Sequence, residues 1–221
     1  MTLVFGAIMT NNDSDVPGRK LSVLAIGAHP DDIELGCGGS LAKLAQAGAS
    51  IEAVVFSKGR RGALSDSDRA AETENALRSL GVGKLTIYDF EDTQLWRCVT
   101  DLIAVLDRHI AECAPDRVYT MFQHDRHQDH RAVYEASAIA CRRVPQLLGY
   151  ETPSSYPNFL PTVFEAIEDH LETKISALRR HESQGDRLYM QEEKIRSAAH
   201  FRGVQVDLGP SEGFIPYKMV L

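Results

Sequence analysis

Residues 21–39 read LSVLAIGAHPDDIELGCGG, and this stretch decides the fold. Its first six residues, 21–26, are apolar except for Ser22, which is typical of a strand buried on both faces of a parallel sheet. In the run that follows, 39–47, apolar residues recur at helical spacing, and the run stops at Gly48, a common C-terminal cap. The stretch therefore predicts a strand and then a helix, with a polar turn before the helix.

The same alternation continues along the chain. Further strands are expected at residues 51–56, 84–88 and 117–122, and further helices at residues 68–80, 99–113 and 131–143. Asp129 stands where it would cap the last of these helices. Strands that alternate with helices of this length predict an α/β fold, Rossmann-like and doubly wound, with a mainly parallel sheet flanked by helices.

The pattern changes after Gln146. A fifth strand at 147–150 is expected to lead into an irregular loop, 152–161, which holds three prolines and is long enough to be functional. Helical patterns follow at 169–181 and 188–199. The last residues, 214–221, are expected to form an edge strand, which would tolerate Pro216.

Length and composition favour one soluble domain. The chain has 221 residues, and we interpret 1–20 as an N-terminal tail or an added edge strand and 21–221 as a single domain. A net charge of -7 gives no general attraction to phosphate backbones, so we expect no nucleic-acid partner. The first residues have neither the pattern of a secretory signal nor the length of a membrane span. Four widely spaced cysteines indicate a reducing compartment, so a cytoplasmic location is expected.

A first cluster of polar residues, Ala28-His29-Pro30-Asp31-Asp32, comes directly after the first expected strand. Open α/β sheets bind ligands outside the carboxyl ends of their strands, which is where this cluster falls. Imidazole nitrogen and carboxylate oxygen both suit zinc, and a catalytic zinc takes three protein ligands and a water. His29 and one aspartate could supply two ligands. The alternative is a turn in which Asp31 or Asp32 only caps the next helix.

A second cluster, residues 124–130, reads HDRHQDH and follows the fourth expected strand at the same edge of the sheet. It could supply a third ligand and leave another histidine to act on the substrate, with a neighbouring aspartate to fix the ring tautomer. The alternative is a solvated polar loop in which Asp129 is a cap. Two such clusters after two parallel strands favour a metal site.

These motifs resemble a known family. The run AHPDDIELGCGG (28–39) and the HQDH of residues 127–130 are similar to the zinc-dependent deacetylases of N-acetylglucosaminides, the PIG-L or LmbE-like family. The resemblance extends from about Leu21 to the C-terminus. Weaker similarities are the GRRG of residues 59–62, Arg69-x-x-Glu72, and His181-x-Ser183-Gln184.

The resemblance implies roles for eight residues. Zinc would be held by His29, Asp32 and His130. Asp31 would be the general base that takes a proton from the attacking water. His127, supported by Asp129, would be a charged group that stabilises the oxyanion and supplies a proton to the departing amine. Arg60 or Arg61 would lie near the substrate, and we favour Arg60. The resemblance also makes a homo-oligomer plausible.

The expected function is that of a zinc-dependent hydrolase that removes the N-acetyl group from an N-acetylglucosamine-type substrate, a small-molecule amino-sugar conjugate. One alternative is an amidase that cleaves a sugar-thiol conjugate with the same site. Another is a non-catalytic nucleotide- or metal-binding module. Residues 36–39, GCGG, do not support a nucleotide site, because Leu41 breaks the G-x-G-x-x-G pattern. These glycines are expected to pack a helix against the sheet.

Overall fold

The computed structural model describes residues 19–62 and 68–220. The expected N-terminal tail or edge strand, residues 1–20, therefore lies almost entirely outside the described residues. Within the described part, seven strands form one sheet in the order β3-β2-β1-β4-β5-β7-β6. The strands are β1 (Ser22–Gly27), β2 (Ser50–Val55), β3 (Lys84–Ile87), β4 (Arg117–Met121), β5 (Gln146–Tyr150), β6 (Val163–Ala166) and β7 (Ser211–Met219).

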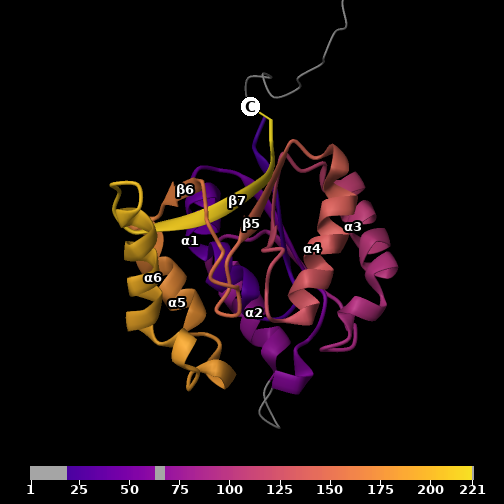
Figure 1. Ribbon diagram of the computed structural model, residues 1–221, viewed down its shortest axis with the longest axis horizontal. Helices are drawn as coiled ribbons and strands as arrows, with labels where there is room; N and C mark the ends of the chain where they lie inside the picture. Colours follow the sequence, from indigo (N-terminus) through magenta and orange to yellow (C-terminus); the bar gives the residue numbers. More distant parts are fainter. Residues whose placement is uncertain (1–18, 63–67, 221) are drawn as a thin grey trace, which may run out of the picture.

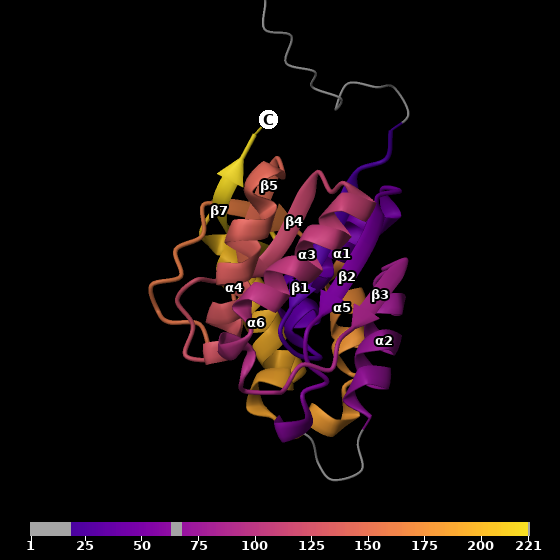
Figure 2. The same cartoon turned by 90° about the vertical axis from the view of Figure 1, so that its right-hand side faces the viewer.

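Strands β3, β2, β1, β4 and β5 are parallel, and β7 is antiparallel to both β5 and β6. Figure 2 shows β3 and β2 toward one side of the sheet and β5 and β7 toward the other. Helices α3 and α4 cover one face, and α1, α2, α5 and α6 lie on the opposite side (Figure 1). The predicted doubly wound α/β architecture is confirmed.

The helices in the described residues are α1 (Asp32–Gln46), α2 (Arg69–Ser79), α3 (Val99–Cys113), α4 (Gln128–Ala140), α5 (Leu171–Leu178) and α6 (Glu192–Val204). Short 3-10 turns are η2 (Arg60–Gly62), η3 (Leu95–Arg97), η4 (Cys141–Arg143), η5 (Glu168–His170), η6 (Glu182–Gln184) and η7 (Leu188–Met190). Of the helices described, none combines the length and the apolar character needed to cross a membrane.

The C-terminal strand differs from the expectation. Strand β7 is not an edge strand, because β6, which the sequence pattern did not predict, pairs with it and forms the edge. Strand β6 is only four residues long and half-buried, so it carries little of the apolar pattern of a core strand. It pairs with β7 only over the residues from Ser211 to Phe214. The register of β7 on β5 also shifts beside Pro216, so a proline is tolerated there.

Helix α1 begins at Asp32, seven residues before the predicted start at 39. The helix is interrupted at Cys37, whose φ of -142° is not helical. A Cβ on Gly36 would lie 2.0 Å from the Tyr150 ring, and one on Gly39 would lie 2.6 Å from Ile167. The glycines therefore let the helix pack closely against neighbouring elements, as predicted.

Glu212 of β7 caps the second half of α1. Its carboxylate accepts hydrogen bonds from the backbone N–H of Gly39 (3.0 Å) and of Ser40 (2.7 Å) and from the Ser40 hydroxyl (2.6 Å). It also pairs with the buried ammonium of Lys174 at 2.5 Å. An anion at this helical N-terminus satisfies N–H groups that have no partner within the helix. The ion pair thus fixes α1, α5 and β7 to one another.

Loss of the Glu212 carboxylate is predicted to destabilise the fold. We expect Glu212→Ala to lower the free energy of unfolding by about 3–5 kcal/mol, because Lys174 would remain as an uncompensated buried charge. Urea unfolding followed by circular dichroism measures this loss.

The matched control is Glu165→Ala, which breaks a pair with Lys43 nearer the surface and should cost about 1 kcal/mol or less. Adding Lys174→Met to Glu212→Ala should restore part of the stability, because no ammonium then stays buried unpaired. Equal losses for Glu212→Ala and Glu165→Ala would contradict the role given to the cap.

Candidate metal centre

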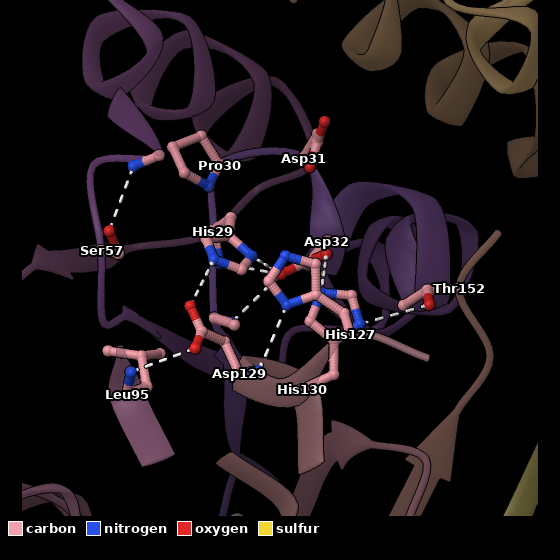
Figure 3. A network of polar contacts seen from close by, with 12 residues as sticks. His29, Pro30, Asp31, Asp32, Ser57, Leu95, His127, Asp129, His130 and Thr152 are labelled. Carbon is pink, nitrogen blue, oxygen red and sulfur yellow. Dashed lines mark hydrogen bonds and ion pairs between the residues drawn. The ribbon is translucent and has the colours of Figure 1, made fainter. Parts of the chain in front are cut away.

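The adjacency of β1 and β4 brings the two predicted clusters together. The chain leaves β1 toward β2 on one side of the sheet and leaves β4 toward β5 on the other, so the carboxyl ends of β1 and β4 mark the point where the strand order reverses. Ligands bind at such points in open α/β sheets. Residues 29–32 follow β1, and His127 and His130 lie at the start of α4 (Figure 3).

Asp32 lies between two imidazole rings. Its Oδ1 is 3.3 Å from Nε2 of His130, and its Oδ2 is 3.5 Å from Nδ1 of His29. Oδ2 also accepts hydrogen bonds from the backbone N–H of Ala28 (3.1 Å) and of His29 (2.7 Å). Burial acts to raise the pKa of Asp32, but His130 and His29 hold it well below its usual value. Asp32 is therefore a buried carboxylate that stays ionised.

In both His29 and His130, one ring nitrogen faces Asp32 (the inner nitrogen) and the other (the outer nitrogen) lies against a further carboxylate. Nε2 of His29 is 3.1 Å from Asp129 and 3.2 Å from Asp92, and Nδ1 of His130 is 3.2 Å from Asp125. Burial opposes the charged form of both rings, but the carboxylates outweigh it. The pKa of His29 is raised well above its usual value, and that of His130 is raised to about 9.

This arrangement fits a metal ion. Histidines that bind metals usually donate the hydrogen of the outer ring nitrogen to a carboxylate, which leaves the inner nitrogen free to coordinate. Nδ1 of His29 and Nε2 of His130 both face Asp32, so two imidazole nitrogens and one carboxylate meet. This donor set suits zinc, although ligand type alone does not define the metal.

His127 is a third imidazole at the site. Each of His29, His127 and His130 offers a nitrogen within 4.8 Å of the others, and the His127 ring stacks on His130 with 4.7 Å between centroids. Nδ1 of His127 accepts a hydrogen bond from the backbone N–H of Asp129 (3.2 Å). A neutral ring in this arrangement carries its proton on Nε2, so it can donate a hydrogen bond but cannot coordinate through that atom.

The environment of His127 also disfavours a charged ring. Burial and, after it, the charges of His29 and His130 lower its pKa, while Asp129 acts in the opposite direction. The resemblance implied a charged His127 supported by Asp129. In the structure, the link from Asp129 to the His127 ring is a backbone N–H, and the Asp129 carboxylate instead contacts His29.

Asp129 does not cap α4, contrary to the prediction. Helix α4 begins at Gln128, and the cap is His127. The buried carboxylate of Asp129 is occupied elsewhere, because it accepts hydrogen bonds from the backbone N–H of Thr93 (2.7 Å) and of Leu95 (3.0 Å). It therefore ties the segment after β3 to His29.

Asp31 and Asp32 point in different directions (Figure 3). Asp31 has a φ of 97°, a left-handed conformation that is strained in a residue other than glycine, and its side chain makes no capping hydrogen bond to α1. Oδ2 of Asp31 is instead 3.2 Å from the guanidinium of Arg69. Burial and the charge of Asp32 raise the pKa of Asp31 to about 7. Neither aspartate is only a helix cap.

Arg69 holds this strained turn in place. Its buried guanidinium also donates to the carbonyl oxygens of Pro30 (2.7 Å) and Gly59 (2.9 Å). Residue Glu72, one turn further along α2, accepts hydrogen bonds from the backbone and the hydroxyl of Ser183. Residues 69–72 and 181–184, which carry the weaker similarities to the family, therefore contact each other beside the metal centre.

A pocket of about 350 Å³ opens onto the site, and its lining includes His29, Asp31, Asp32, His127 and His130. Both arginines are exposed and paired, Arg60 with Asp89 at 2.8 Å and Arg61 with Glu91 at 3.2 Å, but Arg61 lines this pocket and Arg60 does not. The geometry therefore favours Arg61, whereas Arg60 was the predicted substrate contact. Residues 152–154 of the irregular loop also line the pocket.

Sequence reasoning missed two residues that complete the site. Asp92 contacts His29 and accepts a hydrogen bond from the Arg61 backbone (2.8 Å). It lies in the segment after β3, so the rule that pointed to the ends of β1 and β4 could have found it. Thr152 donates to Asp125 at 2.8 Å, and no motif signals this contact.

Comparison with known proteins identifies the family of this chain. The family model described as PIG-L, GlcNAc-PI de-N-acetylase, matches residues 24–141. The uncharacterized deacetylase YaiS of Escherichia coli K12 is 48% identical over 171 residues, which cover 75% of this chain and 92% of the relative.

Two solved structures share the fold. The conserved protein TT1542 from Thermus thermophilus has a TM-score of 0.80 at 25% identity, with 91% of this chain and 96% of that chain covered. The N,N'-diacetylchitobiose deacetylase from Pyrococcus horikoshii has a TM-score of 0.74 at 26% identity, with 88% and 83% covered. Sequence and fold thus agree, and the chain belongs to the PIG-L family.

Proposed function

We propose that this protein is a zinc-dependent hydrolase that removes the N-acetyl group from an N-acetylglucosamine-type substrate. The observation that carries the proposal is the buried His29–Asp32–His130 cluster, in which carboxylates hold both outer ring nitrogens. Membership of a family of deacetylases supports the removal of an acetyl group. We also propose a reducing, cytoplasmic location, which agrees with the free thiols of all four cysteines.

His29, Asp32 and His130 would hold the zinc. When bound, the ion supplies a Lewis acid that polarises an acyl carbonyl and lowers the pKa of a water molecule. The protein contributes the position of this charge, because the contacts with Asp129 and Asp125 fix both rings.

Asp31 is the proposed general base. Arg69 holds Oδ2 of Asp31, and the carboxylate lines the same pocket as the two imidazoles. Asp31 takes a proton from water as the new carbon–oxygen bond forms at the acyl carbon. It returns that proton to the nitrogen as the carbon–nitrogen bond breaks. The products are acetic acid and a free amine, which exchange one proton to give acetate and an ammonium group.

His127 is the proposed hydrogen-bond donor to the oxygen that becomes negative. Because its Nδ1 accepts the Asp129 N–H, the neutral ring presents Nε2–H. This departs from the charged histidine that the resemblance implied, and it leaves the protonation of the amine to Asp31. A fixed donor of this kind acts mainly on the transition state, where the negative charge develops.

The first prediction from the proposed function separates metal binding from proton transfer. Asp31→Asn should keep its zinc and lose about 10²–10⁴-fold in kcat, because the amide accepts no proton. Metal analysis after dialysis and the release of free amine from N-acetylglucosamine derivatives measure the two quantities.

The control for this prediction is His130→Ala, which should lose zinc and activity together. Treatment with a chelator should inactivate the wild type, and added zinc should restore it. A zinc-loaded Asp31→Asn variant with wild-type turnover would exclude Asp31 as the base. A wild type with zinc but no turnover would favour a non-catalytic metal-binding module.

A second prediction concerns the carboxylates behind the ligands. Asp125→Asn should weaken zinc binding about 10–100-fold, because the amide no longer holds His130 as an anion does. Competition with a chromophoric chelator measures the affinity. Asp107→Asn, which changes an exposed aspartate paired with Arg142, is the matched control and should have no effect. Equal affinities in the two variants would show that Asp125 does not support the metal.

A third prediction tests the substrate side. Arg61→Ala should raise KM about tenfold through the loss of a charge-assisted hydrogen bond, with a smaller effect on kcat. Arg60→Ala, its neighbour outside the pocket, is the control and should leave KM unchanged. The opposite result would return the assignment to Arg60.

A further inference from the structure

A second pocket of about 260 Å³ adjoins the catalytic pocket. It lies among α1, α6, β7 and the start of the irregular loop. Four residues line both pockets: Leu35, Thr152, Pro153 and Tyr189. The two pockets therefore border each other along these four residues, which form a wall that they share.

Small and apolar groups form much of the second pocket. Helix α6 contributes Ile195, Ala198 and Ala199, and α1 and β7 contribute Gly36 and Gly213. These residues offer contact surface without hydrogen-bonding side chains. An apolar group that binds there would remove both its own surface and the apolar surface of the pocket from water, which is favourable.

The charged side chains of this pocket are already paired. Arg202 makes two hydrogen bonds to the Glu151 carboxylate, both 2.6 Å long, and Lys174 pairs with Glu212 at 2.5 Å. The ammonium of Lys194 lies 3.7 Å from Glu193. Because these charges are matched within the protein, the pocket does not need a charged ligand. The catalytic pocket differs, since imidazoles, carboxylates and Arg61 line it.

We propose that the second pocket binds an apolar alkyl or aryl substituent of the same substrate whose amide lies at the metal centre. The inference rests on the proposed function and names a further feature of the substrate: a polar amino sugar joined to an apolar group. That group is attached either through the aglycone or through the acyl chain. One molecule that reaches both pockets is the proposed ligand, because the second pocket lies directly beside the metal centre's pocket.

Three probes with one sugar test the inference. Methyl 2-acetamido-glucoside carries no apolar group, its hexyl glycoside carries one on the aglycone side, and its N-hexanoyl analogue carries one on the acyl side. Calorimetry on zinc-loaded Asp31→Asn measures each Kd without turnover. One of the two tails should lower Kd at least tenfold, since each buried methylene contributes about fourfold. Which tail gains affinity distinguishes the two attachments.

Two variants on the exposed side of α6 locate the effect. Ala198→Trp fills the mouth of the second pocket and should remove the gain from the tail, while the methyl glycoside binds as before. Ser197→Trp, which adds the same side chain one position away and outside the pocket, should keep the gain. Ala198→Leu is a smaller change that is used if the Ala198→Trp variant unfolds. Thermal melts measure whether each variant is folded.

The outcomes separate the two proposals. Equal Kd values for all three probes, or a gain from the tail that persists in both Ala198 variants, overturn the second pocket as a substrate site. Turnover of the three probes by the zinc-loaded wild type is measured in parallel. If none is hydrolysed, the proposed deacetylation is wrong. The dependence of Kd on the tail and on Ala198 then still decides whether the second pocket binds an apolar group.

Discussion

The contact of the Asp32 carboxylate with two buried imidazoles is the interaction on which the rest of the site depends. Five aspartates, at positions 31, 32, 92, 125 and 129, are buried around His29 and His130. Burial of so many carboxylates is unfavourable unless positive charge compensates for it. The raised pKa values of His29 and His130 are one form of that compensation, and a divalent cation is another. Binding of a cation would release the protons from these rings, which couples metal affinity to pH and to folding.

The sheet makes this concentration of charge possible. Parallel pairing of β1 with β4 places residues 29–32 and 127–130 at one edge, although about a hundred positions separate them in the chain. The turn after β1 then has to direct two neighbouring carboxylates to different partners. It does so with a left-handed Asp31, and the hydrogen bonds of Arg69 to Pro30 and Asp31 hold that strained backbone. Neighbouring aspartates can therefore serve different purposes in the same pocket.

The sequence predicted the parts of the molecule that follow from periodicity and from the ends of strands. Strands β1 to β5 and the convergence of His29 with His130 required only these rules. Strand β6 was not predicted, because four half-buried residues carry too little pattern. The cap of α4 was assigned to Asp129, although the long-range contacts of this carboxylate with Thr93 and Leu95 take precedence over a local cap. The choice between Arg60 and Arg61 depends on which way a 3-10 turn faces, and sequence spacing does not encode that direction.

Helix α1 reaches both pockets just before its interruption at Cys37. Before it, Asp32 belongs to the metal centre and Leu35 lines both pockets, whereas Leu41 and Ala42 after it pack in the core. Lys174 donates to the carbonyl of Leu35 just before the break, and Glu212 caps the N–H groups just after it. One buried ion pair thus stabilises α1 at the break between the part that reaches the site and the part that packs in the core.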